Sequence, residues 1–212
     1  MLFRIILLLL IVSTVQVQAR PVSYPGGWTV STFNDADRYS AFLHYSPTAK
    51  YSIGYHGEYW RDDDYQIHAL HMNNLLKRWN GEASQGNFYL MSGIGFAHSD
   101  EGEFDNRNEL AAYTGISADW ETRKVFFSYA NRITEAGNIA DNFIQNIRFG
   151  FAPYVAEYGN WHTWLMMRVS HAPEADDQLV ATPIVRLFKG ADLLEAGISD
   201  QGDVLFNFVH RF

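Results

Sequence analysis

VLFNFVHRF, residues 204–212, ends this chain, and the two sets of alternate residues in it differ in their aromatic content and polarity. In a β-strand every second side chain points to the same face of the sheet. One face is therefore apolar and rich in aromatic rings, and it consists of Val204, Phe206, Phe208, His210 and Phe212. The segment predicts a terminal β-strand with this face outward, which directs Arg211 inward.

The segment resembles the closing strand of bacterial outer-membrane β-barrels, whose C-terminal Phe belongs to the segment that the barrel-assembly machinery recognises. The resemblance implies that Phe208, His210 and Phe212 form an assembly signal, although His210 stands where related barrels often carry another aromatic residue. It also implies an antiparallel up-and-down barrel in the bacterial outer membrane, surrounded by outer-membrane lipids and delivered by that machinery. No motif identifies a specific family.

The beginning of the chain agrees with export. Arg4 precedes an apolar run at residues 5–12, and Val17-Gln18-Ala19 offers small residues at the cleavage positions. This pattern predicts a cleaved signal peptide over residues 1–19. The run is too short for a membrane helix, which needs about 20 apolar residues. Residues 20–212 are then expected to form one outer-membrane barrel domain.

The composition fits the same class. The mean hydropathy is −0.20 and 16% of the residues are aromatic, as expected where only every second strand residue meets lipid. The formal net charge of −8 argues against nucleic acid as a partner, because its binders need a basic surface. The chain has no cysteine, which excludes a disulfide, a thiolate nucleophile and a lipid-modified cysteine anchor.

Strand-like runs alternate with turn-like clusters from Gly26 onward, and no sustained helical period interrupts them. We count about twelve runs, with ten strands as the alternative. The runs cover residues 28–33, 39–45, 51–60, 65–74, 87–98, 108–118, 124–133, 143–157, 161–170, 179–188, 193–199 and 203–212. Pro153 and Pro183 fall within two of them, and since proline lacks the ladder N–H, we expect a bulge or a strand end at each.

The connections separate by charge. Every other connection is acidic, as in Asp62-Asp63-Asp64 and in residues 34–37, 100–105, 174–177 and 200–203. The alternate set carries Lys50, Lys77-Arg78, Arg123-Lys124 and Lys189. In a meander with both ends in the periplasm, alternate connections lie on opposite sides of the membrane. The segregation therefore supports an even number of strands with acidic extracellular loops.

Strand parity also assigns the charges to one face. With Phe212 toward lipid, the inward residues include Arg132, Arg148, Arg168, Arg186 and Arg211, together with Glu58, Glu109 and Glu195. A charge that faced the hydrocarbon midplane would cost about 2–4 kcal/mol, so this placement is partly required by the fold.

Three functions remain open. The inward arginines could form a basic path in a narrow passive channel for small anionic solutes, since rings or ladders of Arg set selectivity in anion pores. This arrangement resembles the small twelve-stranded porins that pass acidic oligosaccharides. Alternatively, Arg and Glu pair across a closed lumen, and the barrel is structural or binds a ligand.

The third class is an outer-membrane lipid hydrolase or protease. Its serine would need a base within hydrogen-bond reach, whereas the adjacent Ser170 and His171 point to opposite strand faces. Enzymatic activity is therefore left undecided and is not the preferred class, and we assign no catalytic residue.

The sequence predicts neither a metal site nor a cofactor. His68 and His71 resemble a ligand pair, but residues three apart on a strand face opposite ways. Inward His44, His56 and His162 are expected to be hydrogen-bonded lumen residues, and strand parity does not tell whether they converge.

Overall fold

Inward and outward side chains alternate along the strands of the computed structural model, which describes residues 20–99, 106–157, 159–173 and 178–212. The alternation is interrupted by register shifts between Tyr45 and Thr48 and between Leu75 and Lys77. The strands are β1 (Gly27–Asn34), β2 (Arg38–Thr48), β3 (Tyr51–Trp60), β4 (Tyr65–Asn80), β5 (Ser84–Ser99), β6 (Arg107–Thr122), β7 (Val125–Ala136), β8 (Ala140–Phe151), β9 (His162–His171), β10 (Leu179–Lys189), β11 (Asp192–Ile198) and β12 (Val204–Arg211).

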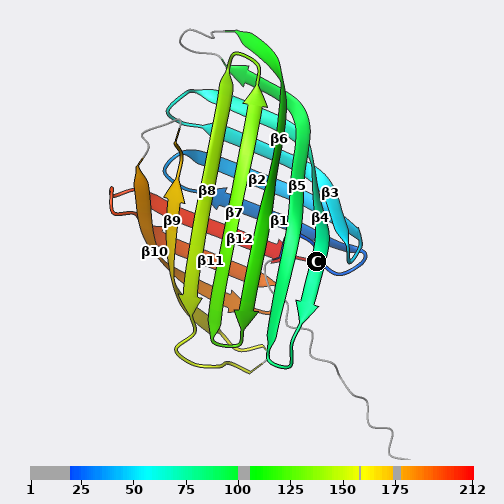
Figure 1. Cartoon of the computed structure of the whole chain (residues 1–212), viewed down its shortest axis with the longest axis vertical. Coiled ribbons are helices and arrows are strands. Elements are labelled where there is room, and N and C mark those ends of the chain that lie inside the picture. Colours follow the sequence, from blue (N-terminus) through cyan, green and yellow to red (C-terminus); the bar gives the residue numbers. More distant parts are fainter. Residues whose placement is uncertain (1–19, 100–105, 158, 174–177) are drawn as a thin grey trace, which may run out of the picture.

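Each strand pairs antiparallel with the next along the chain, and β1 pairs with β12 to close the barrel. The barrel has twelve strands, which confirms the expected number and excludes the alternative of ten. In Figure 1, strands β4 to β8 run along the long axis, while β1, β2, β11 and β12 cross behind them at an angle.

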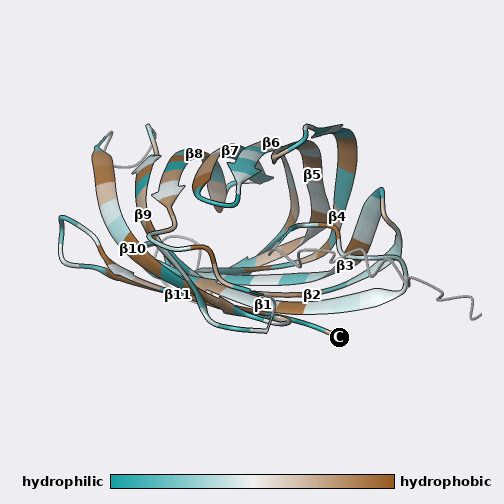
Figure 2. Ribbon diagram, turned by 90° about the horizontal axis from the view of Figure 1, so that it is seen from below, coloured by the Kyte–Doolittle hydropathy of each residue, from teal (hydrophilic) through white to brown (hydrophobic). Residues whose placement is uncertain are grey.

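The barrel is flattened in cross-section. Figure 2 shows β1, β2, β11 and β12 forming a nearly flat floor, with β5 to β8 arching over it. The longest strands, β4, β5 and β6, have 16 residues each and rise along one side of the arch. Side chains from the floor and from the arch therefore meet across a narrow lumen.

Inward glycines allow neighbouring strands to approach closely. A Cβ atom at Gly95 would lie 1.9 Å from the His68 carbonyl oxygen, and one at Gly115 would lie 2.0 Å from that of Asn131. Gly93 instead makes room for the ring of Tyr113, which would lie 2.2 Å from an added Cβ. The Gly93-Ile94-Gly95 segment thus supplies small inward residues, as the sequence suggested.

Gly95→Ala is expected to destabilise the barrel by about 1–3 kcal/mol, the usual range for an overpacked site. The methyl group would meet backbone atoms, which cannot rotate away. The temperature at which the folded form is lost, followed by gel mobility, measures the effect. Gly86→Ala is the control, because its nearest contact would be an ordinary 3.4 Å. Equal stability of the two variants would contradict the argument.

The outward surface has the composition that a bilayer requires. Leu70, Ile94, Phe96 and Leu110 are all more than half exposed on adjoining strands. Four tryptophans lie outward at the end of the barrel that carries the chain termini, each 43–54% exposed; they are Trp28, Trp79, Trp120 and Trp161. Exposed tyrosines mark the opposite end at Tyr39 and Tyr59. Aromatic girdles of this kind flank the apolar band of membrane barrels.

Several boundaries differ from those expected. β4 continues to Asn80, whereas the fourth run was expected to end at residue 74, so Lys77 and Arg78 lie on this strand and not in a connection. The eighth run does not continue to residue 157, because β8 ends at Phe151 and Pro153 lies in the connection to β9. Pro183 lies within β10, and the β10–β11 register begins one residue later, at Ile184. The missing N–H is thus placed where the ladder ends, as proline requires.

Some expectations lie outside the described residues, namely the signal peptide over residues 1–19 and the acidic segments at 100–105 and 174–177. Among the elements that are described, none is a helix with the length and hydropathy needed to cross a membrane.

Candidate functional site

Glu58 is the centre of one buried ionic cluster. Arg132 of β7 donates two hydrogen bonds to its carboxylate, at 2.6 Å and 2.7 Å. Arg38 of β2 approaches the same carboxylate at 3.4 Å, and His56 Nε2 lies 3.1 Å from it. Because β7 and β3 are four strands apart in the barrel, the Arg132–Glu58 pair spans the lumen. Two arginines share one carboxylate, which leaves an excess of positive charge.

Glu195 is the centre of a second buried ionic cluster. Arg186, its cross-strand neighbour, donates to Oε1 at 2.7 Å, and Arg148 of β8 donates to Oε2 at 3.1 Å. Asn207 of β12 adds a bond of 2.6 Å. The carboxylate side chain is only 2% exposed. Here too, two arginines share a single acid.

A cavity of about 290 Å³ lies between the two clusters. Its lining includes four of their arginines, which are Arg38, Arg132, Arg148 and Arg186, together with Glu195. Phe33, Phe42 and Tyr113 supply rings, and Asn131 and Asn146 supply amide groups. The volume lies near the lower end of small-molecule sites, which start at about 300 Å³. The lumen can therefore receive a small solute, in a positively charged and partly apolar setting.

A chain of hydrogen bonds lies beside this cavity. Asn73 donates its amide to the Pro21 carbonyl oxygen at 3.3 Å, so its own oxygen is left to accept from His71 Nε2 at 2.9 Å. A neutral His71 then accepts from the Tyr113 hydroxyl at 2.8 Å. That hydroxyl can in turn accept from His56 Nδ1, at 2.7 Å. The chain connects the Glu58 cluster to the segment that precedes β1.

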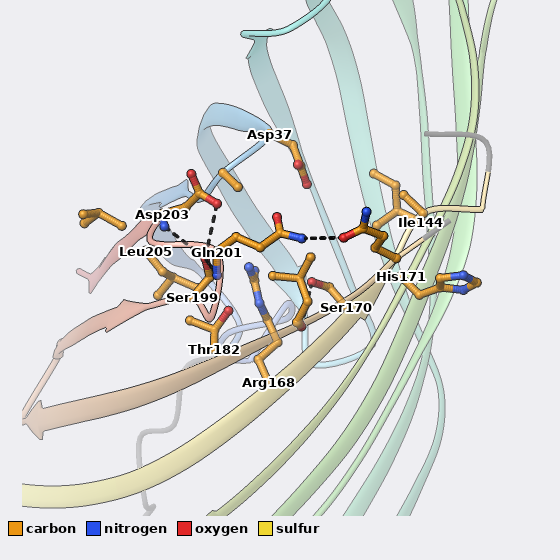
Figure 3. A pocket seen from close by; sticks show the side chains of 15 residues that line it. Asp37, Ile144, Arg168, Ser170, His171, Thr182, Ser199, Gln201, Asp203 and Leu205 are labelled. Atoms are coloured by element: carbon orange, nitrogen blue, oxygen red, sulfur yellow. Dashed lines mark hydrogen bonds between the residues drawn. The ribbon is translucent and has the colours of Figure 1, made fainter. Parts of the chain in front are cut away.

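A smaller pocket of about 70 Å³ lies toward the end of the barrel that carries the β1–β2 connection. Figure 3 shows Arg168 extending toward Asp37, with Thr182 and Ser170 on either side. Arg168 is not in the central cavity lining, and it donates to Asp35 Oδ2 at 2.9 Å. Asp35 follows directly after β1, so this pair joins a loop to the opposite wall.

The two aspartates of this loop have opposite electrostatic environments. Burial by itself would raise the pKa of Asp35, but the positive charges of Arg38 and Arg168 outweigh it and hold the pKa below the ordinary 3.8. The pKa of Asp37 is raised, first by burial and then by the negative charge of Asp35. The fold thus favours the charged form of Asp35 and disfavours the charged form of Asp37.

These shifts predict opposite pH profiles for Asp35→Asn and Asp37→Asn. A depressed pKa stabilises the fold above the ordinary 3.8, and this contribution is lost as the pH falls through the folded value. Asp35→Asn should therefore unfold at a lower temperature than the wild type at pH 7, with the gap closing in acid. A raised pKa has the reverse sign, so Asp37→Asn should be the more stable protein at pH 7. Thermal unfolding across the pH range measures both, and parallel profiles would contradict this assignment.

The inward arginines do not form one continuous path. Arg132, Arg148, Arg186 and Arg168 divide into three groups, each around an acid. The guanidinium of Arg211 donates to the Arg20 carbonyl oxygen. Glu109 is on the inward side of β6, but its carboxylate accepts a hydrogen bond of 3.3 Å from Asn138 in the β7–β8 connection, away from both clusters. That these inward arginines and glutamates set ion selectivity stays a prediction.

Sequence reasoning missed three partners. Arg38 has the same strand parity as the inward Ser40 and His44, so this signal could have found it. Asp35 and Arg20 lie outside the strands, where parity does not apply.

The other candidate groups follow strand parity. His71 is buried and His68 lies outward beside Tyr55, as expected. His44 and His56 line the central cavity, whereas His162 lies apart from it beside the Tyr154 carbonyl. No group of three or more His, Cys, Asp or Glu in the described ranges is arranged to hold a metal ion. The His171 ring is directed away from Arg168 and Asp37 (Figure 3), and the Ser170 hydroxyl points to the Val180 carbonyl.

No model of a known protein family matches the chain, and no curated protein sequence does. Among solved structures it is similar to a KdgM porin in complex with disordered oligogalacturonate. The TM-score is 0.50 at 5% identity, over 88% of this chain and 98% of that chain. The chain shares the fold of this porin. It is also similar to OccK8 (OprE) of Pseudomonas aeruginosa, with a TM-score of 0.44 at 11% identity over 82% of this chain and 57% of that chain.

Proposed function

We propose that this protein is an outer-membrane channel for the passive passage of small anionic solutes. The observation that carries the proposal is the excess of arginine over carboxylate on the cavity wall, where Glu58 and Glu195 are each shared by two arginines. Charged groups that line a narrow pore select ions of the opposite sign. The apolar outer band, the aromatic girdles and the shared fold support the membrane location.

Arginine also suits the chemistry of the solute. Its planar guanidinium presents several donors that match carboxylate and phosphate oxygens. The similar KdgM structure holds oligogalacturonate, an acidic oligosaccharide. Small carboxylates and sugar acids are therefore the first solutes to test.

A planar-bilayer recording tests this function. The purified protein should give discrete conductance steps, and a salt gradient should give a reversal potential with the sign of anion preference. Protein unfolded by heat before addition is the control for detergent artefacts. Cation preference would contradict the proposal.

A structural or ligand-binding barrel with a closed lumen is the second candidate. It is favoured by the pairs that cross the lumen, Arg132 with Glu58 and Arg148 with Glu195. Bilayers that stay silent with every folded form of the protein, variants included, would favour this candidate.

A further inference from the structure

We propose that residues 20–23 form a plug that is seated inside one end of the lumen, and that solutes pass only when this plug leaves its seat. The proposal rests on the proposed channel function. It adds a constriction that the arginine clusters do not themselves supply.

Arg20 reaches across the barrel. Its carbonyl oxygen accepts a hydrogen bond of 2.8 Å from Arg211 of β12, and its guanidinium donates to Glu121 of β6 at 2.8 Å. In the closed strand order, β12 and β6 are six steps apart, which is half of the circumference. A single residue that is bonded to both walls must cross the lumen between them.

The residues that follow are held by β2, β3 and β4. The Pro21 carbonyl accepts from Ser52 of β3 at 2.9 Å and from Asn73 of β4 at 3.3 Å. The Ser23 amide donates to the hydroxyl of Ser46 on β2 at 3.0 Å. Val22 between them is only 3% exposed. The segment is thus packed inside the barrel and does not extend along its rim.

The seat lies at the end of the barrel where the chain termini and the shortest turns are. Glu121 is one residue from the end of β6, and Arg211 is the last residue of β12. Arg20 and Pro21 also line the central cavity, together with Thr29 and His44. A solute that leaves the cavity through this end would therefore meet the segment.

Removing the seat is the first test. Ser52→Ala with Asn73→Ala deletes both donors to the Pro21 carbonyl. The unit conductance in planar bilayers should rise by about twofold or more, because a wider constriction passes more ions. The matched control is Ser92→Ala with Asn74→Ala on the outward face of β5 and β4, which should conduct as the wild type does.

Locking the seat is the second test and does not depend on the first variant folding. The chain has no cysteine, so Ser23→Cys with Ser46→Cys introduces the only pair. Oxidation should form a disulfide and lower the current by about half or more, and a reductant should restore it. Absence of the disulfide would contradict the seat, and equal currents in the oxidised and reduced forms would contradict the plug.

The outcomes separate the two proposals. A wild-type channel with anion preference whose current ignores both the seat variant and the lock would overturn the plug and leave the channel intact. Silence in every form, the seat variant included, would overturn the channel itself. A silent wild type with a conducting seat variant would support both.

Discussion

Glu58→Gln should lower the free energy of unfolding by about 3–5 kcal/mol, because breaking a buried ion pair from one side leaves charges without compensation. Glu58 is 1% exposed at its side chain and is shared by Arg38 and Arg132. Glutamine keeps the shape and part of the hydrogen bonding but removes the charge. The two guanidinium groups would then face each other across the lumen. Unfolding by urea in lipid vesicles measures the loss.

Glu109→Gln is the matched control for this prediction. Glu109 also lies on the inward side of its strand, but its carboxylate bonds Asn138 in a connection, and the bond is exposed. Its removal should change the free energy of unfolding by less than about 1 kcal/mol, as for other exposed contacts. If Glu58→Gln were as mild as this control, the cluster around Glu58 would not hold the barrel together.

Arg148→Ala with Arg186→Ala should abolish the anion preference of the channel. In the wild type, these two arginines exceed the single negative charge of Glu195. Their loss leaves the carboxylate alone on the cavity wall, so the local charge changes from positive to negative. The reversal potential in a salt gradient should fall to near zero, because the charge of Glu195 then offsets the excess of arginine around Glu58.

A third variant keeps this prediction independent of folding. Arg148→Ala, Arg186→Ala and Glu195→Gln together remove the whole cluster and leave no uncompensated charge. Its anion preference should fall between those of the wild type and the double variant, because the Glu58 cluster keeps its excess of arginine. Three identical reversal potentials would exclude the Glu195 cluster from selectivity. Arg61→Ala, outside the cavity lining, should leave the reversal potential unchanged.

The strands and their faces were predictable, because both follow from local alternation. The phase set by Phe212 places Arg211 inward, and Arg211 is indeed buried. The same phase correctly separated His68 from His71 and Ser170 from His171. The eighth run was extended too far because the aromatic and apolar residues after Phe151 suit a strand, whereas Pro153 ends the ladder. Strand parity predicts which face of the wall a residue occupies, but not its position along the barrel axis or its neighbour across the lumen.

The grouping of the charges depended on the closed barrel. Glu58 and Arg132 are 74 residues apart, and they meet because β3 and β7 face each other in a flattened cross-section. The inward glycines contribute to that shape through close backbone contacts that no periodicity reveals. The sequence also showed nothing of the role of Arg20, because the alternation of inward and outward side chains does not apply to a segment outside the strands.

The sequence by itself determined the barrel and the side of the wall on which the strand charges lie, and it predicted about twelve strands. These properties follow from a period of two residues and from the cost of exposing charge to lipid. Only the tertiary structure decided which acid each arginine meets and that residues 20–23 cross the lumen. Those contacts join strands far apart in the chain, and the curvature of the closed sheet sets their distances.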